Sequence, residues 1–403
     1  MKNYSFETIL LLCFGILVID ILSYYGLTQL VFDMISIDLQ RAITILFWLF
    51  TIGLISAIIV LKRRVDRIHP KKKQILISRM YGLTVSSFIP KIIFVLVVIA
   101  LLISENYFLH GRWLTTITYI ALGAGFLPFF AIVFAIFKSK YNFKIHRLPL
   151  QFDHIPPSFK GLKIVQISDL HLGSFNYNYS VLDKAVKLIN DLSPDLIFFT
   201  GDIVNNFAWE LEGWETVLKK LQATTGKFAV LGNHDYGDYS EWEFPQEKKD
   251  NFKKICAFFE DINFTLLLND SAVVKRASDE IAIIGVENWG RPPFKQYGKL
   301  KEALHKVQKV PFKILLSHDP SHWSEEVLTH TDIALTLSGH THGMQAGVNL
   351  RNKSWSPIKY KYKEWAGVYE YQQQRLYVNR GLGWMGFPGR LGMRPEITLI
   401  TLT

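Results

Sequence analysis

Acidic, amide and imidazole side chains recur in five short segments of this 403-residue chain, and all three kinds bind metal ions in proteins. The segments read Ser168-Asp169-Leu170-His171, Gly201-Asp202, Gly232-Asn233-His234-Asp235, Ser317-His318-Asp319 and Gly339-His340-Thr341-His342. Seven of their residues form a mixed oxygen and nitrogen set without a thiolate: Asp169, His171, Asp202, Asn233, His318, His340 and His342. Such a set suits manganese, iron or zinc rather than calcium, which prefers cages made of oxygen.

Seven ligands are too many for one tetrahedral ion, but they are enough for two ions if one carboxylate bridges. Two metals roughly 3.5 to 4 Å apart clamp the attacking and leaving oxygens in phosphoester hydrolysis. The alternative is that each residue only caps a helix or satisfies a turn. That alternative explains any single segment, but it does not explain five of them in order.

Each of the five segments follows an apolar run of strand length. These runs cover residues 163–167, 196–200, 228–231, 313–316 and 333–337. Helical apolar spacing appears at residues 180–192, 209–221 and 248–259. Alternating strands and helices predict a largely parallel sheet whose carboxyl ends form one rim. We therefore expect all five segments on that rim.

The order Asp-x-His, Gly-Asp, Gly-Asn-His-Asp, His and Gly-His-x-His resembles that of the calcineurin-like metallophosphoesterase superfamily, over about residues 162–403. The closing Pro395-Glu396-Ile397-Thr398-Leu399-Ile400 is similar to the membrane-attached bacterial branch of that superfamily. The resemblance implies a two-sheet α/β/β/α sandwich. It also implies a hydrolase that cleaves phosphoester or pyrophosphate bonds, with a metal-bridging hydroxide attacking phosphorus.

The resemblance also divides the ligands between two divalent ions, for which manganese is favoured over iron and zinc. One ion would be held by Asp169, His171, Asp202 and His342. The other would be held by Asp202, Asn233, His318 and His340. Asp202 would then bridge the two ions.

Three further residues gain expected roles from the resemblance. His234 would be the histidine that contacts the phosphate and stabilises or protonates the leaving oxygen. Asp235 is expected to orient His234, since a histidine needs its other nitrogen held to fix its tautomer. Asn205 stands where purple acid phosphatases have a tyrosine ligand, so a charge-transfer iron site is not expected.

Four long apolar runs precede these segments, at residues 6–27, 43–61, 83–103 and 114–137. Each is about the ~20 residues that a helix needs to cross a bilayer. A buried globular core would explain one run but not four in succession. The first run is interpreted as a retained helix rather than a cleaved signal peptide, because Asp20 interrupts it and no Ala-x-Ala site follows.

Basic residues indicate the orientation of the protein in the membrane. Residues 62–82 contain eight lysines and arginines against one acidic residue, whereas the loops expected at 28–42 and 104–113 carry little charge. By the positive-inside rule the basic stretch is cytoplasmic, and four crossings return the chain to that side. We expect a multi-pass protein of the inner membrane whose catalytic domain faces the cytoplasm. The basic stretch is interpreted as an anchor to anionic headgroups rather than a nucleic-acid site.

The sequence thus predicts a membrane domain over residues 1–137, a basic, proline-containing linker over 138–161 and a phosphoesterase domain over 162–403. The part after residue 137 carries only a small net positive charge, which argues against a nuclease that grips long duplexes. Cys13 lies in an expected membrane helix and Cys256 in an expected soluble helix, so no disulfide is predicted.

Two features leave alternatives open. Residues 359–363 alternate Lys and Tyr and predict a strand, and the glycine-rich stretch 379–390 follows another. In this stretch or just after it, Arg380, Arg390 or Arg394 would hold a substrate anion, while Trp384, Met385 and Phe387 meet acyl chains or the bilayer. Alternatively, the stretch closes the core of the second sheet. In the membrane part, Asp20 is expected to face other helices and Lys91 to extend to the cytoplasmic surface.

The leading function is hydrolysis of a lipid-linked or other amphiphilic phosphoester at the membrane. Within the superfamily, the UDP-diacylglucosamine pyrophosphatases show that membrane-associated members act on lipid precursors, although this is an analogy. The alternatives are a soluble nucleotide-type substrate, a non-catalytic membrane scaffold and a transporter with an attached domain. Intact ligands and an intact His234 argue against the scaffold.

Overall fold

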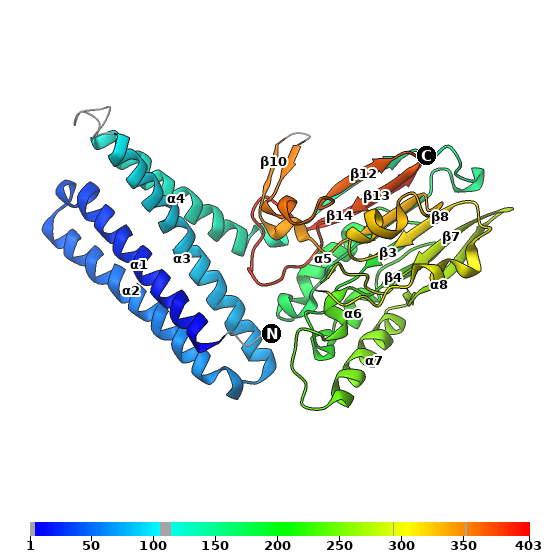
Figure 1. Ribbon diagram of the computed structural model, residues 1–403, viewed down its shortest axis with the longest axis horizontal. Coiled ribbons are helices and arrows are strands. Elements are labelled where there is room, and N and C mark those ends of the chain that lie inside the picture. Colours follow the sequence, from blue (N-terminus) through cyan, green and yellow to red (C-terminus); the bar gives the residue numbers. More distant parts are fainter. Residues whose placement is uncertain (1–4, 105–113, 293, 351–352) are drawn as a thin grey trace. The chain divides into compact units, whose positions relative to one another are not determined.

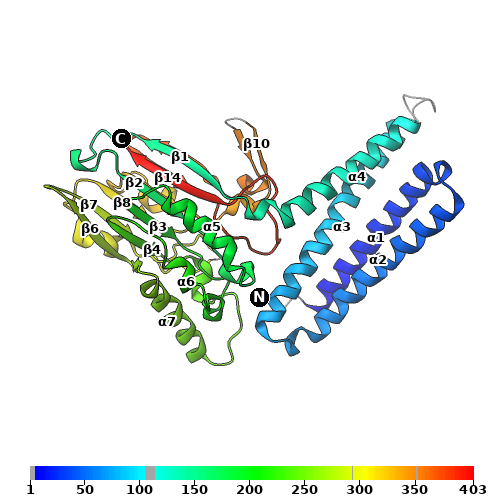
Figure 2. The same cartoon turned by 180° about the vertical axis from the view of Figure 1, so that it is seen from behind.

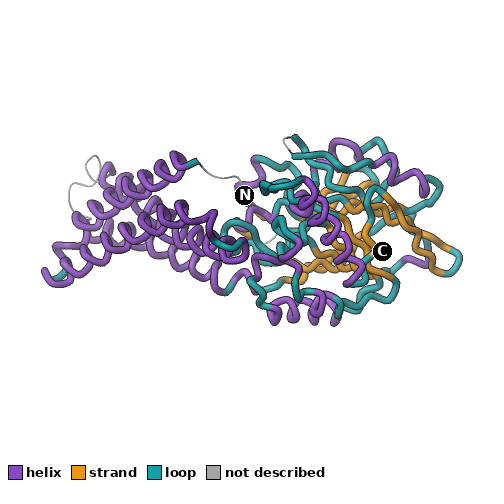
Figure 3. Tube along the Cα trace, turned by 90° about the horizontal axis from the view of Figure 1, so that it is seen from below, coloured by secondary structure: helices purple, strands orange, loops and turns teal. Residues whose placement is uncertain are grey.

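The computed structural model describes residues 5–104, 114–292, 294–350 and 353–403. The chain divides into two compact units. One contains Lys138–Met385 and Arg390–Thr403, and the other contains Lys2–Phe137 and Gly386–Gly389. Figure 3 shows that the described part of the second unit is built of helices, whereas the strands belong to the first.

The helical unit contains four long helices: α1 (Phe6–Val31), α2 (Ile37–Arg64), α3 (Pro70–Ser104) and α4 (Leu114–Phe137). All four are long and apolar enough to cross a membrane, which confirms the four predicted apolar helices. The basic stretch 62–82 is mostly helical rather than a loop, because Lys, Arg and Gln are good helix formers. Most of the loop expected at 104–113 lies outside the described residues.

Asp20 on α1 is buried and bonded to two other helices. Lys91 Nζ on α3 donates to Asp20 Oδ1 at 2.7 Å, and Thr51 Oγ1 on α2 donates to Oδ2 at 2.5 Å. Lys91 Nζ also lies 4.6 Å from the centroid of the Phe47 ring. Asp20 therefore faces other helices as expected, but the prediction that Lys91 extends to the surface is wrong. A buried carboxylate attracts the ammonium group more strongly than a distant water layer does.

Breaking this ion pair from either side should destabilise the helical unit. Asp20→Asn or Lys91→Met leaves one buried charge without its partner, which costs about 3–5 kcal/mol, whereas the double variant should recover most of that loss. The thermal unfolding midpoint of the full chain in detergent measures the effect. Asp38→Asn is the matched control, because the Asp38 side chain is 97% exposed. Equal midpoints for the single variants and this control would contradict the prediction.

Two six-stranded sheets form the other unit, in the orders β1-β14-β2-β3-β4-β5 and β12-β13-β9-β8-β7-β6. The first sheet consists of β1 (Lys144–Leu150), β14 (Glu396–Leu402), β2 (Lys163–Ile167), β3 (Leu196–Thr200), β4 (Gly226–Val230) and β5 (Thr265–Leu266). The second consists of β12 (Gly367–Tyr371), β13 (Gln374–Val378), β9 (Leu335–Ser338), β8 (Lys313–Leu316), β7 (Asp279–Gly285) and β6 (Asp270–Arg276). A short hairpin, β10 (Val348–Leu350) and β11 (Lys353–Trp355), stands apart from both (Figure 1).

Helices cover the outer face of each sheet. The first sheet packs against α5 (Tyr179–Asn190), α6 (Glu215–Leu218) and α7 (Pro245–Asp261), and the second packs against α8 (Leu300–Leu304) (Figure 1). Alternate residues of the strands, such as Ile164 and Phe198 facing Ile283 and Leu316, fill the core between the sheets. The predicted two-sheet α/β/β/α sandwich is confirmed.

Some predicted segments differ locally. Gly213, with φ of 79°, interrupts the helix expected at 209–221, which leaves a 3₁₀ turn and the short α6. Residues 357–360 form a 3₁₀ turn rather than the start of a strand, because Pro357 starts the turn and Ser356 caps it. Part of the segment expected as a linker is the edge strand β1, which pairs in parallel with β14 (Figure 2).

Candidate metal centre

The predicted ligands lie in the loops that leave β2, β3, β4, β8 and β9. β2, β3 and β4 run parallel to one another, as do β7, β8 and β9, so these loops emerge at the carboxyl ends of the strands. Two bonds link the sheets at this edge. Gln166 Nε2 donates to Ser338 O at 2.9 Å, and His318 Nδ1 donates to Thr200 O at 2.7 Å. The loops at the carboxyl ends of the strands in the two sheets therefore lie together and form one site.

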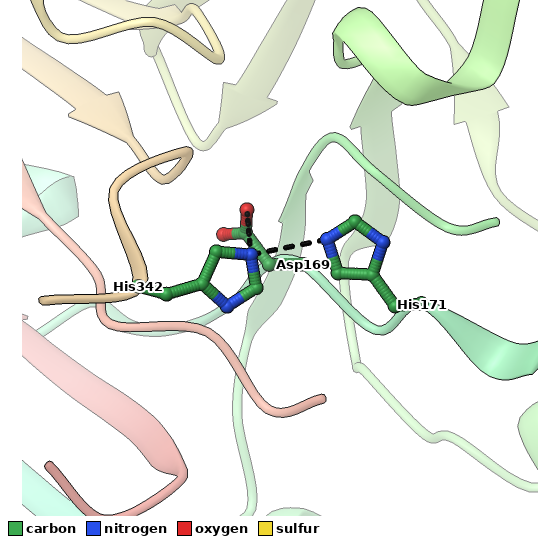
Figure 4. Close-up of side chains that lie close together, drawn as sticks. All are labelled: Asp169, His171 and His342. Atoms are coloured by element: carbon green, nitrogen blue, oxygen red, sulfur yellow. Dashed lines mark hydrogen bonds and ion pairs between the residues drawn. The ribbon is translucent and has the colours of Figure 1, made fainter. Parts of the chain in front are cut away.

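The first group of ligands gathers at Asp169. His342 Nε2 lies 3.3 Å from Asp169 Oδ1 and 3.0 Å from His171 Nε2, so three donor atoms converge on one point (Figure 4). Asp202 Oδ2 lies 3.6 Å from His171 Nε2. All four side chains are buried, and the donor atoms of Asp169, His171 and His342 lie close enough together to hold one ion.

The second group of ligands begins at the same carboxylate oxygen. Asp202 Oδ2 lies 3.2 Å from His318 Nε2, which lies 3.2 Å from Asn233 Oδ1. His340 Nδ1 then lies 2.8 Å from Asn233 Oδ1 and 3.3 Å from His318 Nε2. All seven side chains thus form two neighbouring groups that share Asp202.

Burial prepares His171 and His340 as neutral ligands, whereas His318 carries a raised pKa beside Asp202. His171 Nδ1 donates to Val204 O at 3.2 Å, so its lone pair is on Nε2, which faces the other donor atoms. Burial lowers the pKa of His171 to about 3 and that of His340 to about 4. Burial acts on His318 in the same direction, but the Asp202 carboxylate outweighs it and raises the pKa of His318 to about 10. Asp202 therefore attracts positive charge to this point, as a ligand shared by two cations should.

Five of the seven ligand residues have a left-handed backbone, with φ between 45° and 73°: Asp169, His171, Asp202, His340 and His342. Residues other than glycine rarely adopt this region, and clusters of such residues occur at functional sites. The backbone of one ligand loop also lies very close to the side chain of another. A Cβ atom on Gly232 would lie 2.2 Å from Asp202 Oδ1, so glycine is required there. The donor set and the strained backbone fit a metal centre.

His234 lies beside the first group, with its ring centroid 5.2 Å from that of His171. Its Nδ1 donates to Asn205 O at 2.7 Å, which leaves Nε2 without the ring proton. The Asp235 carboxylate instead accepts four backbone N–H bonds of 2.9 to 3.2 Å, from Gly232, Asp202, Ile203 and Val204. The prediction that Asp235 orients His234 is therefore wrong, because Asp235 holds the backbone of the Asp202 loop.

This arrangement predicts an effect of Asp235→Asn on metal affinity. An amide in that place presents one oxygen instead of two to the four N–H donors, so the Asp202 loop should loosen. Loss of a group that supports a ligand typically lowers metal affinity or activity by about 10- to 100-fold. Titration of the metal-free full chain with Mn²⁺ measures the change. The exposed control Asp191→Asn should bind as the parent does, and an unchanged affinity in Asp235→Asn would contradict the prediction.

Two tyrosines for which the sequence predicts no role contact ligand residues. Asn233 Nδ2 donates to Tyr239 Oη at 2.9 Å, and Tyr362 Oη lies 2.7 Å from His340 Nε2. His340 Nδ1 faces the second group, so Nε2–H donates to Tyr362. Tyr239 lies close in sequence to the Gly-Asn-His-Asp segment, and this closeness signals that it is near the ligands. The sequence gives no such signal for Tyr362, because Tyr362 lies two strands beyond the last ligand and in a stretch that predicts another strand.

The arginines and Trp384 that were expected to contact substrate, in the stretch 379–390 and at position 394, have internal partners. Arg380 pairs with Glu396 at 2.6 Å, and Arg390 Nη1 donates to Arg380 O at 2.9 Å. Arg394 bonds to Asn142. Trp384 is buried, with its ring centroid 4.6 Å from that of Phe175. The alternative that this stretch closes a core is supported for these residues, although the core is the one outside the first sheet.

Comparisons with known proteins agree with this geometry. The family described as "Calcineurin-like phosphoesterase" matches residues 162–344. The family described as "Probable Calcineurin-like phosphoesterase, transmembrane domain" matches residues 5–140. These two ranges separate the helical part of the chain from the part that contains the candidate ligands.

Three proteins are similar to this chain over more than half of its length. The uncharacterized metallophosphoesterase YkuE of Bacillus subtilis is 34% identical over 62% of this chain and 81% of its own length. A transmembrane protein with metallophosphoesterase domain from Bos taurus is 30% identical over 64% of this chain, and the match spans only 55% of that relative. The UDP-2,3-diacylglucosamine pyrophosphatase LpxG of Chlamydia muridarum is 30% identical over 59% of this chain and 81% of its own length.

Proposed function

Because the chain belongs to the calcineurin-like phosphoesterase family, it is a metal-dependent phosphoesterase, and we propose that it cleaves a phosphoester or pyrophosphate bond of an amphiphilic substrate at the membrane. The observation that carries this proposal is the pair of ligand groups that meet at Asp202 Oδ2. Two adjacent divalent ions are the arrangement used for in-line displacement at phosphorus.

The proposed ligand sets follow the two groups. Asp169, His171, Asp202 and His342 would hold one ion. Asp202, Asn233, His318 and His340 would hold the other. The mixture of carboxylate, amide and imidazole suits manganese, with iron or zinc as alternatives. When bound, the ions supply Lewis acidity to the phosphoryl oxygens and lower the pKa of the attacking water.

The chain's own residues then position the substrate and move a proton. In our proposal His234 faces the leaving oxygen with Nε2, because Nδ1 is held by Asn205 O. Nε2 would take up a proton from water and give it to the leaving oxygen, and burial, which lowers the pKa of His234, favours that release. Asp235 keeps the Asp202 loop in place through its four backbone bonds.

Two observations support an amphiphilic substrate. In the described part of the chain, four helices are long and apolar enough to span a bilayer, so membrane lipids surround part of the protein. LpxG, a similar protein, is named for a substrate that carries two acyl groups.

We further propose that the protein lies in the inner membrane and that its phosphoesterase part, from about residue 138 onward, lies in the cytoplasm. The reason is that the positive-inside rule places the basic stretch 62–82 on the cytoplasmic side. Nucleic acid is not expected as a substrate.

The proposal is tested with the full chain in lipid nanodiscs. Metal content is measured first, and turnover is then compared between a small chromogenic phosphodiester and a UDP-linked diacyl sugar. Two metals per chain and a kcat/KM at least about 100-fold higher for the acylated substrate are expected. Equal values for both substrates would favour a soluble, nucleotide-type substrate. A protein without metal and without turnover would favour the membrane scaffold.

A further inference from the structure

An exposed apolar and basic surface lies on the β10–β11 hairpin and the turn after it. Its members are Val348, Trp355, Lys359 and Tyr360, which we call the hairpin patch. Tyr360 is 78% exposed, Val348 is 49% exposed and Trp355 is 44% exposed. Figure 1 shows the hairpin standing out from the two main sheets of its unit. Large side chains exposed together in this way mark interaction surfaces.

The members of the patch are contiguous. Val348 pairs directly with Trp355 across the hairpin, so their side chains share one face. Lys359 Nζ lies 6.0 Å from the Trp355 ring centroid and 5.1 Å from that of Tyr360. The ammonium group therefore lies beside both aromatic rings. Lys361 and Lys363 are also exposed in the following turn.

The patch connects to the metal centre over a short distance in the chain. Ser356, next to Trp355, donates its hydroxyl to Gly343 O at 2.8 Å, and Gly343 directly follows the ligand His342. Tyr362, two residues after Tyr360, bonds to the ligand His340. The base of the hairpin is thus fixed to the loop that carries two ligands.

We propose that the hairpin patch binds the anionic headgroup region of the bilayer and holds the loop that carries His340 and His342 close to the lipid surface. Trp and Tyr favour the membrane interface because one end of each ring system is apolar and the other is polar. Lysines beside them attract anionic lipids, and an apolar lysine stem can lie along the acyl boundary. The four candidate spans keep the bilayer at a high effective concentration, so a small patch suffices.

An exposed aromatic residue elsewhere in the same unit gives a matched contrast. Phe244 is 57% exposed, but Glu241, Glu243 and Glu247 flank it in the sequence. An anionic surface repels such a site. The two sites therefore have similar exposed aromatic character and opposite charge.

The test uses the full chain with its two cysteines replaced, Cys13→Ser and Cys256→Ser, since both are free thiols. Tyr360→Cys or Phe244→Cys then carries a nitroxide label, and the protein is placed in nanodiscs of phosphatidylglycerol and phosphatidylcholine. Collisions with oxygen and with a water-soluble nickel chelate report the depth of each label. We expect the label at 360 to collide more with oxygen and less with nickel than the label at 244.

Two outcomes would overturn the proposal. In one, both labels show the same aqueous collision pattern in anionic nanodiscs. In the other, the label at 360 is shielded equally in nanodiscs with and without phosphatidylglycerol and shows dipolar broadening from a second label, which would identify a second copy of the chain as the occupant. Neither outcome depends on catalysis, so failure of this proposal is distinguishable from failure of the proposed function.

A kinetic measurement, which rests on the proposed function, extends the inference to substrate delivery. Lys359→Glu reverses one charge next to an anionic surface. It should raise the KM for an acylated substrate in anionic vesicles, relative to the KM for a soluble chromogenic phosphodiester, by about 10-fold. An equal change in both KM values would show that the patch does not deliver substrate from the bilayer.

Discussion

Asp202→Asn is expected to lower kcat/KM about 1,000-fold and to reduce the bound metal from two ions to one or none. Asp202 Oδ2 is the atom shared by the two ligand groups, 3.6 Å from His171 Nε2 and 3.2 Å from His318 Nε2. A neutral amide oxygen is a poor bridge between two cations. Bound metals supply several kcal/mol of transition-state stabilisation, and each 1.36 kcal/mol is a tenfold change in rate.

The measurement is metal content together with turnover of a chromogenic phosphodiester. Asp183→Asn is a matched control, because Asp183 is an exposed carboxylate paired only with the exposed Lys220 among the contacts described for its side chain. The control should keep both metals and full activity. If Asp202→Asn also kept two metals and lost less than tenfold in rate, the shared-ligand assignment would be wrong.

His234→Ala should separate chemistry from metal binding. His234 is not a member of either ligand group, and its Nδ1 is bonded to Asn205 O. Its removal should leave two metals per chain while kcat falls by about 100- to 10,000-fold, the usual contribution of a positioned general acid. The loss should be largest for substrates whose leaving group is an alkoxide and smaller for p-nitrophenolate, which leaves without a proton.

His305→Gln, in an exposed turn, is the control for this variant and should behave as the parent does. Comparable losses with alkyl and nitrophenyl leaving groups would remove the assignment of His234 as a proton donor. Loss of a metal in His234→Ala would instead make it a ligand. The two readouts therefore distinguish the roles that a histidine beside a metal centre can have.

The sequence could predict that these ligand segments lie together, because each segment follows the end of a strand. Each ligand segment follows an apolar run, and parallel strands bring their carboxyl ends to one edge whatever the lengths of the connecting helices. The apolar runs at 163–167 and 196–200 coincide with β2 and β3. The sandwich followed from the resemblance, and its cores follow from the alternation of the strands.

Contacts that depend on side-chain direction could not be predicted in this way. Asp235 lies next to His234 in sequence, yet its carboxylate points to the backbone of the Asp202 loop. Trp384 lies in a glycine-rich stretch that predicts exposure, but its ring fills a space beside Phe175. Lys91 and Asp20 are 71 positions apart, and no local pattern joins them. Each case depends on where a distant segment folds back.

The position of β14 has a consequence for biosynthesis. In the first sheet β14 lies between β1 and β2, yet it is translated after every other strand of both sheets. A nascent chain can therefore insert its apolar helices and build the second sheet while the first sheet still lacks the strand that joins the edge strand β1 to β2. Glu396 N donates to Gly381 O beside the ligand loops, so the strand that joins β1 to β2 also fixes the site. The ligand loops should thus take their final positions only after β14 has been made, which is later than the synthesis of α1 to α4.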